Sequence, residues 1–349
     1  MTDDIKDLIC KLFKKRNLTV DEYELLIKNR NDEIYEVLQA EALRLRHNIY
    51  GNTIYIRGLI EISNYCKNDC FYCGIRRSNK QCERYRLTEQ DILSCCEKGY
   101  ELGFRTFVLQ SGEDAHLNDD FVCLLIEKIK EKHSDCAVTL SLGERSKESF
   151  QKLFDAGADR YLLRHETADF HHYSKLHPEN MKLEARLECL QNLKEIGFQV
   201  GCGMMVGSPY QSEMNLAKDL KFIEDFQPDM CGIGPFIPHK DTPFKSENSG
   251  SVDLTCFLLA LVRIIKPNIL LPSTTALGTI DEDGREKGIS ASANVLMPNL
   301  SPTNVRSKYS LYNNKLITGA ETAEKLKELK ERMNEIGYTV ICDRGDIIK

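Results

Sequence analysis

The stretch TIYIRGLIEISNYCKNDCFYC, residues 53–73, joins an apolar run to three closely spaced cysteines. Its first half, residues 53–63, is rich in β-branched residues and predicts a strand. Its second half places Cys66, Cys70 and Cys73 directly after that strand, in the spacing C-x3-C-x2-C. An ordinary iron-sulfur cubane takes four thiolates. A cluster held by this triad would keep one iron open, as a catalytic zinc site keeps one open position.

Seven further β-type runs follow, separated by helical patterns. They lie at residues 106–112, 137–143, 160–166, 199–207, 230–238, 268–274 and 293–299. Helices are predicted to begin at the N-cap residues Thr88, Ser146 and Ser212 and to stop at Gly103, Gly157 and Gly197. Eight β/α units with apolar strands favour a complete (β/α)8 TIM-type barrel over a doubly wound open sheet.

No linker or low-complexity segment divides the chain, so we predict one domain over residues 1–349. An N-terminal helical segment occupies residues 1–47, and the barrel occupies residues 50–305. Residues 306–349 form a C-terminal extension, with a helix at about 320–336. The α/β barrel is thus flanked by N-terminal helices and a C-terminal helical extension.

Composition indicates a cytoplasmic enzyme in a reducing compartment. The net charge of −6 gives no basic field for nucleic acid, and no apolar run is long enough to cross a bilayer. The first residues, MTDDIKDLICKLFKKR, are acidic and amphipathic, unlike a secretory signal. Most of the 14 cysteines lie in apolar segments and are interpreted as buried, reduced thiols.

In a barrel the cysteine triad would lie in the first βα loop, on the rim where barrel enzymes build their active sites. The carboxyl ends of the other strands should face it, and they carry polar or small residues suited to a pocket. These residues include Gln110, Ser111, Gly112, Glu113, Ser141, Glu144, Arg164, His165, Glu166, Gly203, Met204 and Met205.

The triad, with the aromatic Tyr72 just before its third cysteine, resembles the signature of radical S-adenosylmethionine (SAM) enzymes. The resemblance implies one 4Fe–4S cluster on Cys66, Cys70 and Cys73, whose open iron binds SAM. An electron from the cluster then cleaves SAM to methionine and a 5'-deoxyadenosyl radical.

The resemblance narrows to the HydE-type maturases of FeFe-hydrogenase over about residues 50–305. It is carried by IRGLIEISNYCKNDCFYCGIRRSNK, RYRLTEQDI, VLQSGED, VTLSLGE, AGADRYLLRHETA, CGIGPFIPHKDTP and ANVLMPNLSP. It implies that Gln110, Ser111, Gly112 and Glu113 lie near the methionine amino group, and that Ser141, Glu166 and Arg186 contact SAM. Tyr72, Arg164 and Met205 are further cofactor-pocket candidates. Arg186 rests on the resemblance alone, since a helical arginine usually faces solvent.

The resemblance also implies partners: a small iron- or thiol-containing substrate in the barrel cavity, the other hydrogenase maturases, and an electron donor such as ferredoxin or flavodoxin. Some members carry an auxiliary cluster on cysteines after the last strand. Residues 298–341 contain no cysteine and Cys342 stands alone, so we predict no auxiliary cluster on this segment.

Several alternatives stay open. A methylornithine-synthase-like mutase shares the fold and motif, and biotin-synthase-like sulfur insertion would require a second cluster. A non-catalytic metal-binding scaffold, or a structural zinc site on the triad, is a further possibility. His165 is either a hydrogen-bonded structural group or a catalyst. Tyr309 and Tyr312 either pack or cover the barrel mouth, and Cys202 and Cys231 are interpreted as small buried hydrophobes rather than extra metal ligands.

Overall fold

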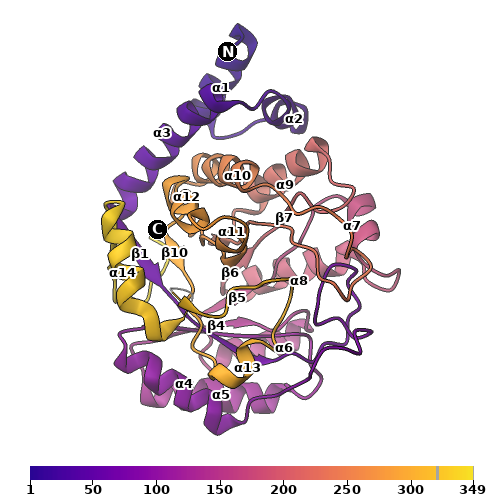
Figure 1. Cartoon of the computed structure of the whole chain (residues 1–349), viewed down its shortest axis with the longest axis vertical. Coiled ribbons are helices and arrows are strands. Elements are labelled where there is room, and N and C mark those ends of the chain that lie inside the picture. Colours follow the sequence, from indigo (N-terminus) through magenta and orange to yellow (C-terminus); the bar gives the residue numbers. More distant parts are fainter. Residues whose placement is uncertain (320–321, 349) are drawn as a thin grey trace.

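The computed structural model describes residues 1–319 and 322–348, in which helices surround parallel strands (Figure 1). Six strands form one parallel sheet in the order β2-β3-β4-β5-β6-β8, and this confirms the predicted α/β class. These strands are β2 (Gly58–Ser63), β3 (Thr106–Ser111), β4 (Ala137–Ser141), β5 (Arg160–Leu162), β6 (Gln199–Cys202) and β8 (Met230–Cys231). The helices among them are α4 (Glu89–Glu101), α5 (Asp119–Lys132), α6 (Lys147–Asp155), α7 (Phe170–Leu176), α8 (Leu183–Ile196) and α9 (Glu213–Phe226).

Two smaller parallel sheets accompany the large one. The first joins β10 (Val295–Leu296), β1 (Thr53–Ile56) and β11 (Thr339–Ile341), and the second joins β7 (Met205–Val206) and β9 (Gly234–Pro235). The predicted complete barrel is therefore not confirmed, because the described strands form three sheets rather than one closed sheet. Isolated parallel bridges link Met230 to Leu270, Pro272 to Val295 and Leu59 to Asn299.

Four predicted strands differ clearly from the structure. The run 199–207 is divided into β6 and β7, and the run 230–238 into β8 and β9. The run 53–63 is divided into β1 and β2 at Arg57, whose buried guanidinium donates to Met230 Sδ (2.8 Å) and to the Gly345 carbonyl (3.2 Å). The run 268–274 forms no strand, because Pro272 has no backbone N–H to donate to a ladder. Within this run, Leu270 and Pro272 make only the isolated bridges to Met230 and Val295.

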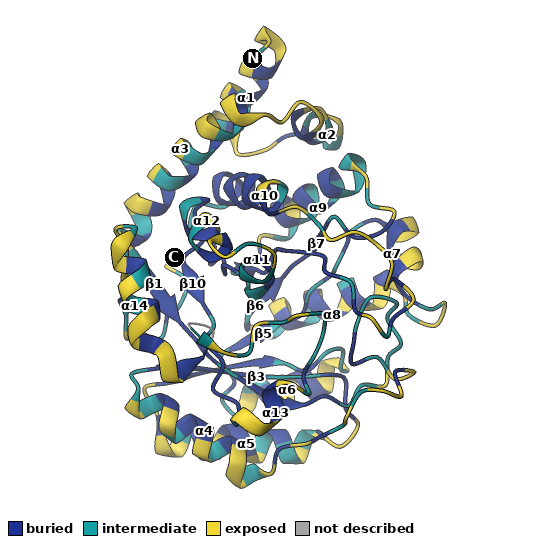
Figure 2. Ribbon diagram, in the orientation of Figure 1, coloured by how far each residue is buried: buried dark blue, intermediate teal, exposed yellow. Residues whose placement is uncertain are grey.

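The N-terminal helical segment consists of α1 (Asp3–Lys15), α2 (Val20–Lys28) and α3 (Asp32–Tyr50). It packs on α9 and on α10 (Val252–Ile265) through buried faces that Figure 2 shows in dark blue. The carboxylate of Glu224 on α9 accepts hydrogen bonds from the Tyr23 hydroxyl (2.7 Å) and the Leu18 N–H (3.2 Å). The segment is thus attached by hydrogen bonds as well as by apolar contact.

The remaining elements follow α10 in the chain. They are α11 (Thr275–Ile280), α12 (Gly284–Ser290), α13 (Thr303–Arg306), the 3-10 helix η2 (Ala323–Lys325) and α14 (Leu326–Glu335). The helix predicted at 320–336 is realised by η2 and α14, and residues 320 and 321 lie outside the described residues.

The predicted helix boundaries are confirmed. Thr88, Ser146 and Ser212 each accept a backbone N–H at the start of α4, α6 and α9. Gly103, Gly157 and Gly197 adopt φ values of +94°, +106° and +110°. Only glycine adopts this left-handed region without strain, so these residues end helices readily.

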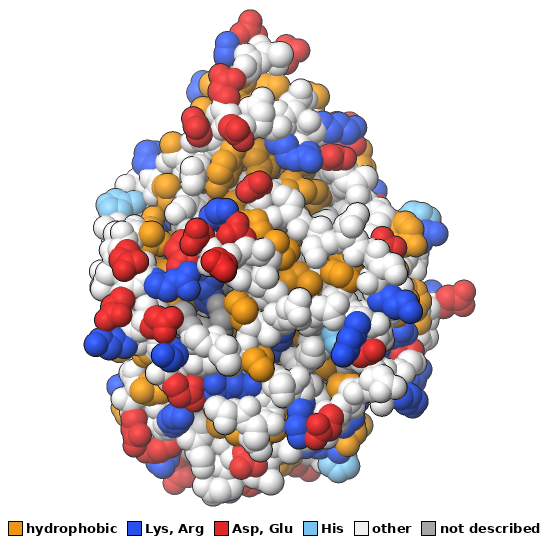
Figure 3. Space-filling model, viewed as in Figure 1, with side chains coloured by type: hydrophobic (Ala, Val, Ile, Leu, Met, Phe, Trp, Pro, Cys, Tyr) orange, Lys and Arg blue, Asp and Glu red, His pale blue; other side chains and the backbone are white. Residues whose placement is uncertain are grey.

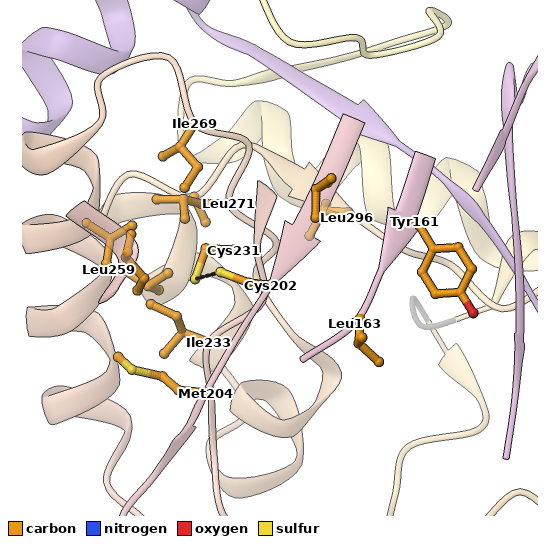
Figure 4. Close-up of a cluster of buried hydrophobic side chains, with 14 of the residues drawn as sticks. Tyr161, Leu163, Cys202, Met204, Cys231, Ile233, Leu259, Ile269, Leu271 and Leu296 are labelled. Atoms are coloured by element: carbon orange, nitrogen blue, oxygen red, sulfur yellow. Dashed lines mark hydrogen bonds between the residues drawn. The ribbon is translucent and has the colours of Figure 1, made fainter. Parts of the chain in front are cut away.

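Cys202 and Cys231 are neighbours in register on β6 and β8 and are completely buried. Their sulfur atoms lie 3.8 Å apart within an apolar cluster that includes Met204, Ile233 and Leu259 (Figure 4). These surroundings support their interpretation as small buried hydrophobes.

None of the helices in the described residues combines the length and apolar character that a bilayer crossing requires. On the face shown in Figure 3, acidic and basic side chains are interspersed around exposed apolar groups.

The C-terminal tail after β11 is attached to β5 of the large sheet by charged groups. Arg344 donates to Asp346 Oδ2 (2.8 Å), and Arg160 of β5 is ion-paired with the same carboxylate. Burial opposes the charge of Asp346, but hydrogen bonding to Arg344 and the charge of Arg160 hold its pKa well below the usual range.

We expect Asp346→Asn to weaken the dependence of stability on acid pH. A carboxyl whose pKa is lowered by folding stabilises the folded state above its unfolded pKa of about 4, and this stabilisation is lost as the pH falls through the folded pKa. The difference in unfolding free energy between wild type and variant should therefore shrink below about pH 5. Denaturant titrations of the reduced chain measure it, with exposed Asp4→Asn as control; a pH-independent difference would contradict the prediction.

Candidate active site

A cavity of about 370 Å³ opens at the carboxyl ends of the strands in the large sheet. The strand-end residues Glu144, Gly203 and Met204 do not line it. The cysteine triad and the cofactor-pocket candidates all do, although they come from segments far apart in the chain. They are Cys66, Cys70, Tyr72, Cys73, Gln110, Ser111, Gly112, Glu113, Ser141, Arg164, Glu166, Arg186 and Met205. His165 is absent from this lining and is fully buried.

The loop that carries the three cysteines follows β2 and is fastened to three other segments. Lys67 N–H donates to the Glu113 carbonyl (2.9 Å), Phe71 N–H to the Leu176 carbonyl (2.9 Å), and Gly74 N–H to the Leu311 carbonyl (2.8 Å). These bonds lie beside Cys66, Cys70 and Cys73 respectively. The backbone therefore fixes the positions of the sulfur atoms before any ligand binds.

Arg84, which belongs to the same loop, stabilises it through hydrogen bonds to the loop's own backbone. Its guanidinium donates to the backbone carbonyls of Asn64 (2.5 Å), Ile75 (2.8 Å), Arg76 (2.6 Å) and Asn79 (3.3 Å). Arg84 thus has a structural role in the cysteine loop.

The thiols lie in surroundings that disfavour an uncompensated negative charge. Burial raises the pKa of Cys66, and burial together with the neighbouring Cys66 raises the pKa of Cys70 to about 12. Burial and the other two sulfurs raise the pKa of Cys73 well above its ordinary value. Three thiolates at this place therefore require a bound cation.

Glycine is required at two points of the rim. A Cβ on Gly112 would lie 2.3 Å from the Tyr65 carbonyl oxygen and 2.7 Å from Cys66 Cβ. Gly143 has φ +80°, and a Cβ there would lie 1.9 Å from Glu113 Cγ. Both glycines let neighbouring segments approach the cysteine loop closely.

Arg186 reaches the cavity from α8 and is 8% exposed. Its Nη1 donates to the Arg164 carbonyl (2.8 Å), its Nε donates to Glu144 (2.5 Å), and Nη2 lies 3.9 Å from Glu113 Oε1. Burial opposes its charge, but Tyr173 and Glu144 raise its pKa, so it stays a cation. The helical position alone would have placed this side chain in solvent.

Glu166 has an unusual backbone for a residue other than glycine, with φ +66°. Its Oε2 is buried and accepts no hydrogen bond from the described residues, although Arg164 Nη2 lies 3.3 Å away. Such strain is typical of functional sites, and Glu166 is among the residues that line the cavity.

Tyr72 is oriented by a histidine that sequence reasoning missed. His177 Nδ1 donates to the Tyr173 carbonyl (3.0 Å), so its Nε2 accepts from the Tyr72 hydroxyl (3.1 Å). Burial lowers the pKa of His177 to about 3, which keeps the ring neutral. No local sequence signal marks this contact across 105 positions.

A second omission is the ion pair between Glu61 and Lys315, which both line the cavity. Glu61 is completely buried on β2 and also accepts from Asn299 Nδ2 (2.9 Å). Lys315 donates to the Tyr309 carbonyl (3.0 Å) as well. The sequence gives one sign of this ion pair, the carboxylate of Glu61 within the apolar run LIEIS. Nothing in the sequence indicates that Lys315 is its partner.

Tyr309 and Tyr312 both line the cavity, on the segment that follows α13. Tyr309 is 2% exposed, and its hydroxyl accepts from Gln110 Nε2 (3.3 Å). The segment thus packs and forms part of the cavity wall at the same time.

Comparison with known proteins identifies the family. Residues 60–223 match the model of the radical SAM superfamily. The [FeFe] hydrogenase maturase subunit HydE of Thermotoga maritima is 42% identical over 308 residues, which cover 88% of this chain and 88% of that protein. This chain belongs to the HydE family of radical SAM enzymes.

More distant relatives share the fold. The 3-methylornithine synthase of Methanosarcina acetivorans is 27% identical over 84% of this chain and 83% of its own. The crystal structure of methylornithine synthase PylB superimposes with a TM-score of 0.80 at 23% identity, covering 95% of this chain and 97% of that one. The structure of HydG, another maturase of the [FeFe]-hydrogenase, gives a TM-score of 0.82 at 22% identity, covering 97% and 76%.

Membership in the radical SAM superfamily implies a 4Fe–4S cluster and SAM, and the cavity fits both. Three sulfur donors from one loop suit a cluster. The raised pKa values show that the thiolate forms are unfavourable here, and bound iron would stabilise them. The cation Arg186 and the carboxylate of Glu166, one oxygen of which accepts no hydrogen bond from the described residues, suit a polar, charged ligand beside the cluster.

The Glu61–Lys315 pair generates a stability prediction for the HydE-family chain. Lys315→Met should destabilise the fold by about 3–5 kcal/mol, since it leaves the buried Glu61 without a counter-charge. Adding Glu61→Gln should recover much of this loss. Lys308→Met is the matched control, because its partner Glu83 is 72% exposed and the pair contributes about 1 kcal/mol at most. Denaturant unfolding measures the free energy of unfolding of each variant. Equal decreases in this free energy in the two Lys→Met variants would contradict the prediction.

Proposed function

We propose that this protein acts in maturation of the FeFe-hydrogenase active-site cluster, by reductive cleavage of SAM. One observation carries the proposal: the cysteine triad and every SAM-contact candidate line a single cavity, in a chain 42% identical to a HydE maturase. When bound there, the cluster supplies the electron that converts SAM to methionine and a 5'-deoxyadenosyl radical.

The residues divide by role. Cys66, Cys70 and Cys73 hold the iron through their thiolates. Gln110, Ser111, Gly112 and Glu113 lie beside the triad, where they would receive the SAM amino group. The carboxylate of Glu166 would accept hydrogen bonds from SAM. The positive charge of Arg186 would balance the negative charge of the Glu166 carboxylate. Tyr72, Ser141, Arg164 and Met205 complete the pocket wall.

We further propose that residues 1–349 act as one domain whose barrel is closed in the working enzyme. The isolated bridges at Leu270, Pro272 and Asn299 support closure, since they join the ends of the large sheet through residues 268–299. A closed wall excludes water from the reacting atoms, which a radical step requires. The C-terminal segment around Tyr309 covers part of the mouth.

The substrate that fits this proposal is a small iron- or thiol-containing molecule within the cavity. A single cluster is proposed, because residues 298–341 contain no cysteine that could hold a second. The reaction needs a low-potential electron donor such as ferredoxin or flavodoxin and the other hydrogenase maturases, in an anaerobic cytoplasm.

We expect Cys70→Ala to abolish both the cluster and SAM cleavage, because two thiolates cannot hold the cubane. Cys66→Ala and Cys73→Ala should behave alike, whereas Cys82→Ala, a thiol on the same loop outside the cavity lining, should not. Iron content, visible absorption and 5'-deoxyadenosine after anaerobic reconstitution and reduction give the result. Full iron content in Cys70→Ala would refute the assignment of this ligand.

In vitro maturation tests the function. Apo-hydrogenase incubated with the other maturases, SAM and reductant should gain hydrogen evolution only when this protein is added, and Cys70→Ala protein should fail. SAM cleavage that rises with lysine, without hydrogenase activation, would favour a methylornithine-synthase-like mutase. A second cluster by iron counting would favour biotin-synthase-like sulfur insertion. No SAM cleavage by a protein with an intact cluster would exclude the enzymatic proposal.

A further inference from the structure

His165 lies between two cavity residues but points the other way. Arg164 and Glu166 line the cavity, while the His165 side chain is completely buried behind it. Its Nε2 lies 3.3 Å from Oδ1 of Asp219, which is also completely buried, on α9. The ring packs against Phe222 of the same helix, with centroids 4.6 Å apart.

The hydrogen bonds fix the form of the imidazole. Gly203 N–H donates to His165 Nδ1 (3.3 Å), so this nitrogen carries no proton. The proton is therefore on Nε2, which faces the carboxylate of Asp219. The same oxygen of Asp219 accepts the backbone N–H of Ala168. Asp219 thus holds the chain one residue before and two residues after Glu166.

Glu166 itself is held by the neighbouring strand. Its N–H donates to the Gly203 carbonyl (2.9 Å), and its carbonyl accepts from Met205 N–H (3.2 Å). A left-handed backbone at a non-glycine residue persists only where its surroundings impose it. Here the left-handed conformation of Glu166 is held by the hydrogen bonds to Gly203 and Met205 on one side and by the contacts of Asp219 with the flanking residues on the other.

We propose that His165 and Asp219 are positioning residues that hold the strained Glu166 backbone, and thereby aim its carboxylate at SAM. This inference rests on the proposed SAM-binding role of the cavity. Neither residue touches the ligand. Both act through the conformation of residues 164–168.

The first test compares Asp219→Leu with Asp219→Asn. The leucine variant removes the oxygen that accepts from Ala168 N–H and faces His165 Nε2, and it should weaken SAM binding at least ten-fold, with iron content unchanged. The asparagine variant keeps an amide oxygen for His165 and Ala168 and should stay within three-fold of wild type. Asp225→Leu, exposed on the same helix, is the matched control. If Asp219→Leu does not fold, His165→Leu removes the same contact from the other side.

A double-mutant cycle separates positioning from general structural support. In a Glu166→Ala background, Asp219→Leu should cause no additional loss of SAM affinity, because the group it positions is gone. An undiminished ten-fold loss there, or a lowered melting temperature with unchanged affinity, overturns the proposal.

Hydrogen exchange on the chain without SAM gives an independent readout. Asp219→Leu should speed exchange at the Glu166 and Ala168 amides by at least ten-fold, while the Lys67 and Gly74 amides of the cysteine loop stay unchanged. Failure of wild-type protein to bind SAM would sink the proposed function, whereas unchanged exchange at Glu166 would sink only the positioning role.

Discussion

The rest of the site depends on one constraint: three thiol groups must be held together in a cavity that disfavours their negative charge. Burial raises the pKa of all three thiols, and the neighbouring sulfurs add to the rise at Cys70 and Cys73, so the three groups are neutral thiols unless a cation binds. Three backbone hydrogen bonds, from Lys67, Phe71 and Gly74, attach the loop that carries them to the rest of the cavity wall. The fold thus holds the three cysteines close together in advance, and bound iron would stabilise their thiolate form.

The charges around the loop follow the same logic. Arg186 is surrounded by Glu113 and Glu144 and remains a cation despite its burial. A cation beside a cluster loop can offset thiolate charge and the carboxylate of a ligand without a change of protonation. His177 has the opposite property, since its lowered pKa keeps it neutral while it orients Tyr72. The cavity wall therefore presents fixed charges and fixed dipoles, which cost no reorganisation on ligand binding.

Sequence periodicity and motif reasoning predicted the parallel α/β class and the helix caps, and the cysteine spacing marked the loop that lines the cavity. They succeeded where the signal is local, as at Thr88 or in the cysteine spacing. They failed where a tertiary contact decides, as at Arg57, whose buried guanidinium splits the first predicted strand. The ion pair of Glu61 and Lys315 spans 254 positions, and no pattern in one sequence links residues so far apart.

The segment from Lys308 to Lys315 joins the two sides of the cavity mouth. Leu311 accepts from Gly74, the residue after Cys73, while Asn313 N–H donates to the Pro238 carbonyl (3.0 Å) across the cavity. Lys315 reaches inward to Glu61 on β2. The position of this segment therefore affects both the backbone beside Cys73 and the charge inside the cavity.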